Sequence, residues 1–184
     1  AAEAGHGDRF KSAEQPAGIY TRKQLRGAIC ATSGIDRLAV AIGAFAGLRT
    51  SEMFCLCWGD IGKQHITVDA AKSKTGSRRI VPVLPALRAV LATVERGAPE
   101  DKVFKQSHEP HLSRVMSDAF RDSETVPVKN GLRHSFCTYR LATTKDAAKT
   151  ALEAGNSPAI IFRHYRELAT PKQGAAWFGV RAPR

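Results

Sequence analysis

The chain has 184 residues and a mass of 19.9 kDa, a length typical of one domain whose own core is large enough to fold without a disulfide or a metal. Its longest apolar run, residues 38–48, is interrupted by two glycines and is too short to span a bilayer. The four cysteines show no framework spacing and residues 1–15 lack a secretion signal, which favours a reducing, cytoplasmic compartment. The 28 Lys and Arg outnumber 17 Asp and Glu, and a formal net charge of +11 indicates a phosphate-rich partner.

The first part of the chain changes from an irregular segment to helical patterns. Residues 1–17 have no hydrophobic periodicity, and we expect them to be a linker from a missing upstream domain. A capping-box pattern from Thr21 to Gln24 then predicts the start of an amphipathic helix. Residues 36–47 predict a buried helix that Gly47 ends, and a short helix is expected over residues 51–58.

The middle of the chain has strand character. Ile66 and Val68 alternate with polar neighbours and a second run follows at 79–83, so we expect an antiparallel sheet of two or three strands. Helical spacing returns at 87–94, where Gly97 is expected to end the helix, and at 112–120. Further helices are expected to begin at Asn130 or Gly131, Thr144, Ser157 and Thr170. The expected fold class is therefore mainly α with a small antiparallel β-sheet, in one domain over residues 18–184.

Four short motifs follow one another along the chain: Gly47-Leu48-Arg49-Thr50-Ser51-Glu52, Ser73-Lys74-Thr75-Gly76, Leu132-Arg133-His134, and Gly155-Asn156 with Tyr165 nine residues later. Their order and spacing resemble the catalytic domain of tyrosine recombinases, the phage-integrase family, over about residues 21–178. The sequence has no cluster of carboxylates suited to hold magnesium, so we expect a reaction without metal or cofactor. The resemblance implies the DNA breaking-rejoining fold of that family. It also implies double-stranded DNA as the partner and a homo-tetramer on paired DNA sites, although this chain alone could remain a monomer.

The resemblance assigns the main catalytic roles. Arg49 and Arg133 correspond to the arginines that hold the phosphate, and a planar guanidinium can bind two of its oxygens at once. Tyr165 corresponds to the nucleophile, although its spacing alone would indicate a core aromatic residue. Lys74 corresponds to the acid that protonates the departing 5′ oxygen. Lys72, two residues away, remains an alternative for that role.

Two asparagines depart from the family pattern. Asn130 stands where the family most often has His, and Asn156 stands where it usually has His or Trp. An amide donates a hydrogen bond to phosphate but cannot hold a proton near neutral pH. We expect both to donate to phosphate. A helix N-cap is the alternative role for Asn130, and a position flanking a glycine stop is the alternative for Asn156.

Other residues are expected to support the site or bind DNA. Glu52 should orient an arginine or a backbone group, and a favourable interaction with a helix dipole is equally open. His134 is expected to be a structural, hydrogen-bonding histidine, and a substitute base is the less favoured alternative. The last helix ends with Trp177 and Phe178, which would dock on a neighbouring subunit or pack into the chain's own core. The side chains expected to contact DNA are Lys72, Arg78, Arg79 and Arg163.

Together these features predict a site-specific recombinase that cleaves and rejoins DNA through a 3′-phosphotyrosine. The main alternative is a recombinase-like DNA-binding protein that no longer cleaves, because two family positions carry asparagine. A basic RNA-binding or ribosome-associated domain is a weaker alternative, since the expected sheet carries no aromatic stacking motif.

Overall fold

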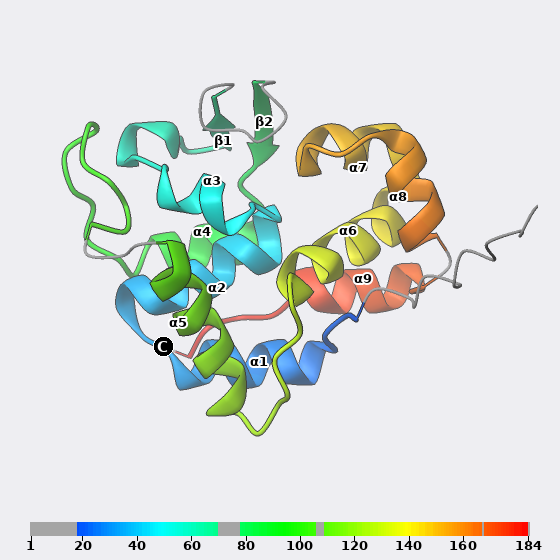
Figure 1. Ribbon diagram of the computed structural model, residues 1–184, viewed down its shortest axis with the longest axis horizontal. Helices are drawn as coiled ribbons and strands as arrows, with labels where there is room; N and C mark the ends of the chain where they lie inside the picture. The colour runs from blue at the N-terminus through cyan, green and yellow to red at the C-terminus, as the bar shows by residue number, and fades with distance from the viewer. Residues whose placement is uncertain (1–17, 70–77, 106–108, 167, 184) are drawn as a thin grey trace, which may run out of the picture.

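The structure, a computed structural model, describes residues 18–69, 78–105, 109–166 and 168–183. Within these ranges helices surround a central buried helix, and one antiparallel hairpin lies on the flank (Figure 1). The predicted fold class is confirmed, and the sheet of the described residues has two strands. No helix in the described ranges is both long and apolar enough to cross a membrane.

Helices α1 (Arg22–Ala31) and α2 (Gly34–Ala46) begin the domain. The predicted capping box at Thr21 is confirmed, with reciprocal hydrogen bonds to Gln24. Helix α2 is buried throughout its second half, as the absence of charged or polar side chains there predicts. Gly47 ends it with a φ of 63°, and a Cβ there would lie 2.2 Å from the Phe136 ring, so both the backbone angle and the packing require glycine.

The short helix predicted over residues 51–58 ends earlier in the structure. Helix α3 covers Thr50–Phe54, and a separate 3₁₀ turn, η1, covers Trp58–Asp60. Between them Cys57 forms a β-bridge with Lys102, and the Trp58 amide donates to the Asp101 carbonyl. Pairing with this later segment takes up backbone groups that a longer helix would need.

The hairpin consists of β1 (His65–Val68) and β2 (Arg79–Pro82). Val68 pairs with Arg79, which sets the register. Because side chains alternate along a strand, Arg79 lies on the inward face, whereas Ile80 is 57% exposed. This register decides the role of Arg79 in the site.

The remaining helices follow in chain order: α4 (Pro85–Leu91), α5 (Glu109–Arg121), α6 (Gly131–Thr144), α7 (Ala147–Ala154), α8 (Pro158–Tyr165) and α9 (Pro171–Phe178). The starts of α6, α8 and α9 agree with the prediction. Helix α4 stops six residues before Gly97, where the prediction had placed its end. Helix α7 begins after Asp146, whose side chain accepts from the Lys149 amide, so the start predicted at Thr144 is wrong.

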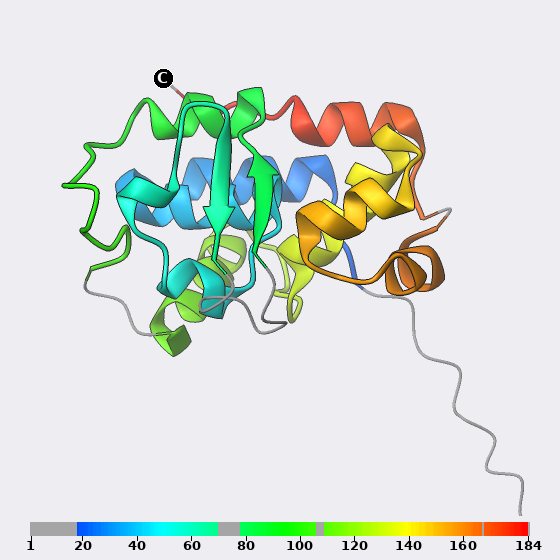
Figure 2. The same ribbon diagram turned by 90° about the horizontal axis from the view of Figure 1, so that it is seen from above.

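Helices α6 to α9 gather at one end of the molecule, beside the hairpin (Figures 1 and 2). Helix α9 packs on α6, and its Trp177 is fully buried. The Trp177 indole donates to the Ala44 carbonyl at 2.9 Å and stacks on Tyr139 with the ring centroids 4.7 Å apart. Of the two placements expected for this helix, the structure shows the intramolecular one.

Candidate active site

Two arginines that are distant in sequence reach the same amide oxygen. Arg49 directly precedes α3, and Arg133 lies in the first turn of α6. The Oδ1 of Asn156 accepts from Nη2 of Arg49 and from Nη2 of Arg133, each at 3.1 Å. Arg49 also donates to the carbonyl of Gly155 at 2.9 Å, and Arg133 donates to the carbonyl of Gly47 at 2.6 Å. The fold therefore gathers three of the predicted site residues into one cluster.

The turn after α7 presents Asn156 to the arginines. Gly155 ends that helix with a φ of 65°, and a Cβ there would lie 2.9 Å from the guanidinium of Arg79. Asn156 is partly exposed, and its amide oxygen accepts hydrogen bonds from both guanidiniums. Its amide nitrogen is then the atom with which the side chain can donate to a ligand.

A buried carboxylate fixes Arg49. Glu52 is 1% exposed and accepts from the backbone amide of Arg49 at 2.8 Å and from its Nη1 at 3.1 Å. Arg79 donates to both oxygens of the same carboxylate, at 2.9 and 2.6 Å. Burial alone raises the pKa of Glu52, but the hydrogen bonds from Arg79 and Arg49 outweigh it and hold the pKa below its ordinary value. The carboxylate therefore stays ionised and orients both the side chain and the backbone of Arg49.

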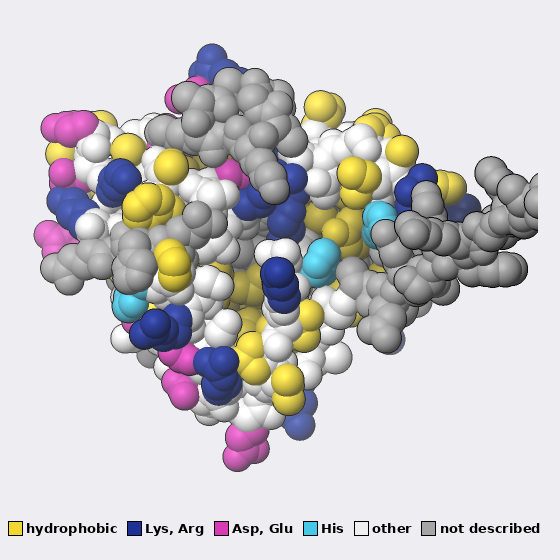
Figure 3. All heavy atoms as spheres, in the orientation of Figure 1, with side chains coloured by type: hydrophobic (Ala, Val, Ile, Leu, Met, Phe, Trp, Pro, Cys, Tyr) yellow, Lys and Arg dark blue, Asp and Glu magenta, His cyan; other side chains and the backbone are white. Residues whose placement is uncertain are grey.

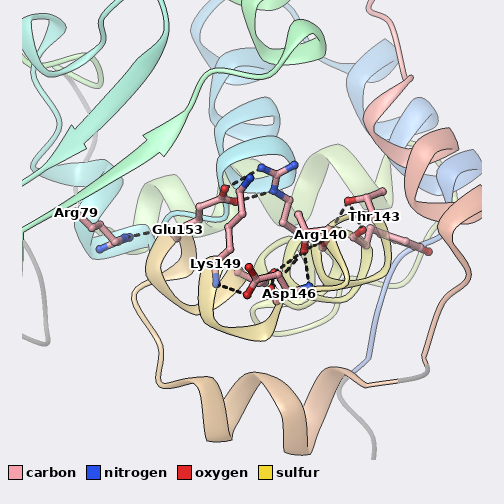
Figure 4. Close-up of polar contacts among 9 residues, drawn as sticks. Arg79, Arg140, Thr143, Asp146, Lys149 and Glu153 are labelled. Carbon is pink, nitrogen blue, oxygen red and sulfur yellow. Dashed lines mark hydrogen bonds and ion pairs between the residues drawn. The ribbon is translucent and has the colours of Figure 1, made fainter.

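The structure places Arg79 in the interior, contrary to its predicted contact with DNA. Its residue exposure is 7%, because the hairpin register turns it toward Glu52. Its Nε donates to the carbonyl of Glu153 at 3.1 Å, and the Glu153 carboxylate accepts from Arg140 at 2.6 and 2.8 Å (Figure 4). Arg79 thus connects the hairpin to α7 and, through Glu52, positions Arg49.

We expect Arg79→Met to lower the free energy of unfolding by about 3–5 kcal/mol, because it leaves the buried Glu52 without its bidentate partner. The neighbouring Arg78 provides a matched control, since it forms a 3.8 Å pair with Asp69 in which both side chains are exposed. Arg78→Met should cost less than about 1 kcal/mol. Urea unfolding of the two variants measures the difference, and equal losses would contradict the positioning role.

Tyr165 ends α8, and its ring is buried among side chains of α6, α7 and α8. Its hydroxyl oxygen lies 2.8 Å from Nδ1 of His134, in the first turn of α6. Burial raises the pKa of Tyr165 to about 12; the neighbouring Cys137 acts in the same direction, and the charges of Arg133 and Arg49 oppose it. The hydroxyl is therefore protonated at neutral pH, and attack on phosphorus requires an acceptor for its proton.

A groove of about 600 Å³ lies between α5 and the start of α6, and Arg49, Arg133, Asn130 and Lys129 are among its lining residues. Figure 3 shows this face hollowed, with apolar side chains at the bottom and Lys and Arg side chains around it. Asn130 occupies the N-cap position of α6, but it has a φ of 55°, and its side chain makes no capping hydrogen bond. Lys129, which the sequence analysis did not single out, is exposed at the groove.

The other predicted site residues lie apart from this cluster or outside the description. Arg78 is exposed beside the hairpin, and Arg163 is exposed on α8. Lys72 and Lys74 lie outside the described residues. In the described part of the chain, no group of three or more His, Cys, Asp or Glu side chains is placed to hold a metal ion.

The sequence matches no protein-family model and no curated protein. The fold, however, is similar to solved structures. XerA recombinase is 17% identical, with 88% of this chain and 62% of that chain covered and a TM-score of 0.68. A lambda integrase (75–356) dimer bound to a COC′ core site is 15% identical, with 85% and 62% covered and a TM-score of 0.64. The catalytic domain of bacteriophage HP1 integrase is 20% identical, with 90% and 96% covered and a TM-score of 0.60.

This chain therefore spans 62% of the length of the XerA recombinase and lambda integrase chains, and nearly all of the HP1 catalytic domain. The chain has the catalytic-domain fold of the tyrosine recombinases and integrases.

Proposed function

We propose that this chain is the catalytic domain of a tyrosine-type site-specific DNA recombinase, an integrase. The observation that carries the proposal is the convergence of Arg49 and Arg133 on Asn156. Close to this point in sequence, His134, the residue after Arg133, is hydrogen-bonded to the hydroxyl of the buried Tyr165. Two guanidiniums held at one point form a site for the singly charged phosphodiester and for the second negative charge that develops on its oxygens in the transition state, because a guanidinium can bind phosphate oxygens with two parallel hydrogen bonds.

In the proposed reaction, Oη of Tyr165 attacks the phosphorus of a DNA phosphodiester. A 3′-phosphotyrosine bond forms and the bond to the 5′ oxygen breaks, with Lys74 as the acid that protonates the leaving oxygen. Arg49 and Arg133 stabilise the charge that develops on the non-bridging oxygens. The free 5′-hydroxyl of a partner strand then attacks the phosphotyrosine, which rejoins DNA without external energy.

Asn130 and Asn156 act in this scheme as hydrogen-bond donors to the same phosphate. Asn156 has the geometry for this, since both arginines occupy its oxygen. Asn130 lines the groove and makes no capping bond that would occupy its side chain. Neither amide can take up a proton, so both are proposed to act in binding and charge stabilisation alone.

We expect Asn130→Asp to slow adduct formation by about a hundredfold or more, since it replaces a donor with a negative charge beside the phosphate. Asp tolerates the left-handed backbone conformation, so the thermal midpoint should stay close to that of the parent. Single-turnover cleavage rates and thermal unfolding measure the two effects. Ser117→Asp, on the α5 wall of the same groove, is a control for added charge. An unchanged rate for Asn130→Asp would exclude Asn130 from the phosphate site.

The proposed partner is double-stranded DNA, bound by an oligomer of this protein on paired sites. Two observations support it, the net charge of +11 and the similar lambda integrase, whose structures include a dimer bound to a core site and a tetramer bound to a Holliday junction. We propose that Lys72, Arg78 and Arg163 contact the DNA backbone.

Binding of this chain to duplex DNA is expected to be weak, to depend little on sequence and to fall steeply with salt, because phosphate contacts release counterions. Fluorescence anisotropy at several salt concentrations gives the slope of log K against log salt. Arg163→Ala should reduce that slope by about 1. A slope near zero for the parent would show that the basic excess does not form the binding surface.

The test of the function uses a nicked suicide duplex, from which a short cleaved strand dissociates and so traps the covalent intermediate. We expect a protein–DNA adduct that resists denaturant and forms equally well in the presence of a chelator. The alternative, a DNA-binding protein that no longer cleaves, predicts a shifted complex under native conditions and no adduct after denaturation.

A further inference from the structure

Among the residues that the structure describes, the hydroxyl of Tyr165 has one hydrogen-bond partner with acid–base capacity near neutral pH. His134 supplies it through Nδ1 at 2.8 Å, and the two rings lie with their centroids 5.9 Å apart. His134 is in the first turn of α6, directly after Arg133, so the arginine that holds the phosphate and the contact to the nucleophile come from consecutive residues of one rigid helix.

The surroundings keep His134 neutral. Burial lowers the pKa of His134 below its ordinary value, and the charges of Arg133 on the same helix and of His164 on α8 act in the same direction. The groups that act on Tyr165 are Cys137, Arg133 and Arg49. Burial raises the pKa of Cys137 to about 11, so this thiol is also neutral and does not compete for a proton near pH 7.

A neutral imidazole with its hydrogen on Nε2 accepts a hydrogen bond at Nδ1. In that tautomer the Tyr165 hydroxyl donates, and its proton already points at a basic nitrogen. The amides of Asn130 and Asn156 have no such capacity, because neither can hold a proton near neutral pH.

We propose that His134 is the general base of the cleavage step, receiving the Tyr165 hydroxyl proton at Nδ1 as Oη bonds to phosphorus. This rests on the proposed function and assigns its missing proton acceptor. The electrons of the O–H bond form the O–P bond, and those of the broken P–O5′ bond stay on the 5′ oxygen, which Lys74 protonates. In the rejoining step His134 returns the proton to the departing tyrosine oxygen.

The test is the pH dependence of single-turnover adduct formation from about pH 5 to about pH 8. For the parent chain the rate should fall about tenfold per pH unit once the pH drops below the pKa of His134, because the protonated ring cannot accept. His134→Gln keeps an oxygen that can accept from the tyrosine but cannot take its proton. We expect this variant to be slower by about 10²–10⁴-fold and to show no acidic fall in rate.

His164→Gln is the matched control, since this histidine lies next to Tyr165 with the ring centroids 6.3 Å apart and is not placed in the machinery. It should keep the acidic fall, displaced toward higher pH because the charge of His164 lowers the pKa of His134, and its rate near pH 8 should stay close to that of the parent. A His134→Gln variant that retains the acidic fall, whether slow or fast, would overturn the proposal and leave His134 a purely structural partner.

Nitrogen-15 NMR spectra of the unmodified chain give a second, independent test if the Gln variant does not fold, because they report which ring nitrogen of His134 carries the hydrogen. An unprotonated Nδ1 and a protonated Nε2 on His134 support the proposal, and the opposite tautomer overturns it, because Nδ1 would then donate to Tyr165. Absence of any adduct in the parent would instead contradict the proposed function. The two failures are therefore distinguishable.

Discussion

Replacement of Tyr165 by Phe is expected to abolish the covalent protein–DNA adduct and to leave DNA affinity unchanged. The substitution removes the attacking oxygen and nothing that carries charge, so phosphate contacts through the arginines should persist. The lost hydrogen bond to His134 should lower the free energy of unfolding by only about 1 kcal/mol. Denaturing gels of suicide-substrate reactions and anisotropy titrations measure the two properties.

Tyr139→Phe is the control for this experiment. Tyr139 is as buried as Tyr165, at 6% exposure, and its hydroxyl is also hydrogen-bonded, donating to the carbonyl of Tyr20 at 2.8 Å. The two variants therefore lose comparable packing and bonding, and only one should lose the adduct. A full-strength adduct from Tyr165→Phe would assign the nucleophile to another residue.

The second large effect is expected for Asn156→Asp, in which stability and activity should change in opposite directions. Asp keeps an oxygen between the two guanidiniums and adds a negative charge there, so the thermal midpoint should be maintained or raised. The same charge repels the phosphate and removes the amide donor, so the cleavage rate should fall about 10²–10³-fold.

Asn156→Ala separates the two contributions, because it removes the oxygen that Arg49 and Arg133 share and should lower the midpoint as well as the rate. Thermal unfolding and single-turnover cleavage of both variants provide the comparison. Normal cleavage by Asn156→Asp would show that the phosphate does not approach this amide.

Local signals predicted much of the fold. The caps at Thr21, Ser157 and Thr170 and the glycine stops at Gly47 and Gly155 each depend on a few neighbouring residues, and all appear as expected. The start of α7, predicted at Thr144, also depends on a local cap, at Asp146, whereas the early end of α3 depends on distant partners. The segment after α3 pairs with residues about 45 positions later, which no periodicity reveals.

The buried position of Arg79 could have been predicted from the alternation of side chains along its strand, but its basic neighbours favoured a contact with DNA. Arg79 alternates with Val81 along the strand, and the buried face of that strand includes both residues. Arg79 was grouped with the neighbouring Arg78 as a DNA contact, whereas the period of two along the strand indicates an inward side chain. A buried arginine needs a carboxylate partner, and Glu52 is the carboxylate that the four motifs contain. In the structure Arg79 donates to both of its oxygens.

The contacts that join the site could not be predicted from local pattern. His134 and Tyr165 are 31 residues apart, and Asn156 lies 107 residues from Arg49. The motifs indicated which residue types would meet. The packing of α6 against α7 and α8 determines that the tyrosine hydroxyl meets an imidazole, and that one amide oxygen meets both guanidiniums.

The central claim, cleavage through a phosphotyrosine, is tested most directly by mapping the adduct. Suicide-substrate complexes are digested with protease and nuclease, and the modified peptide is identified by mass spectrometry. The account predicts a nucleotide attached through its 3′-phosphate to the oxygen of Tyr165. An adduct on any other side chain, or no adduct when the DNA is fully bound, would contradict it.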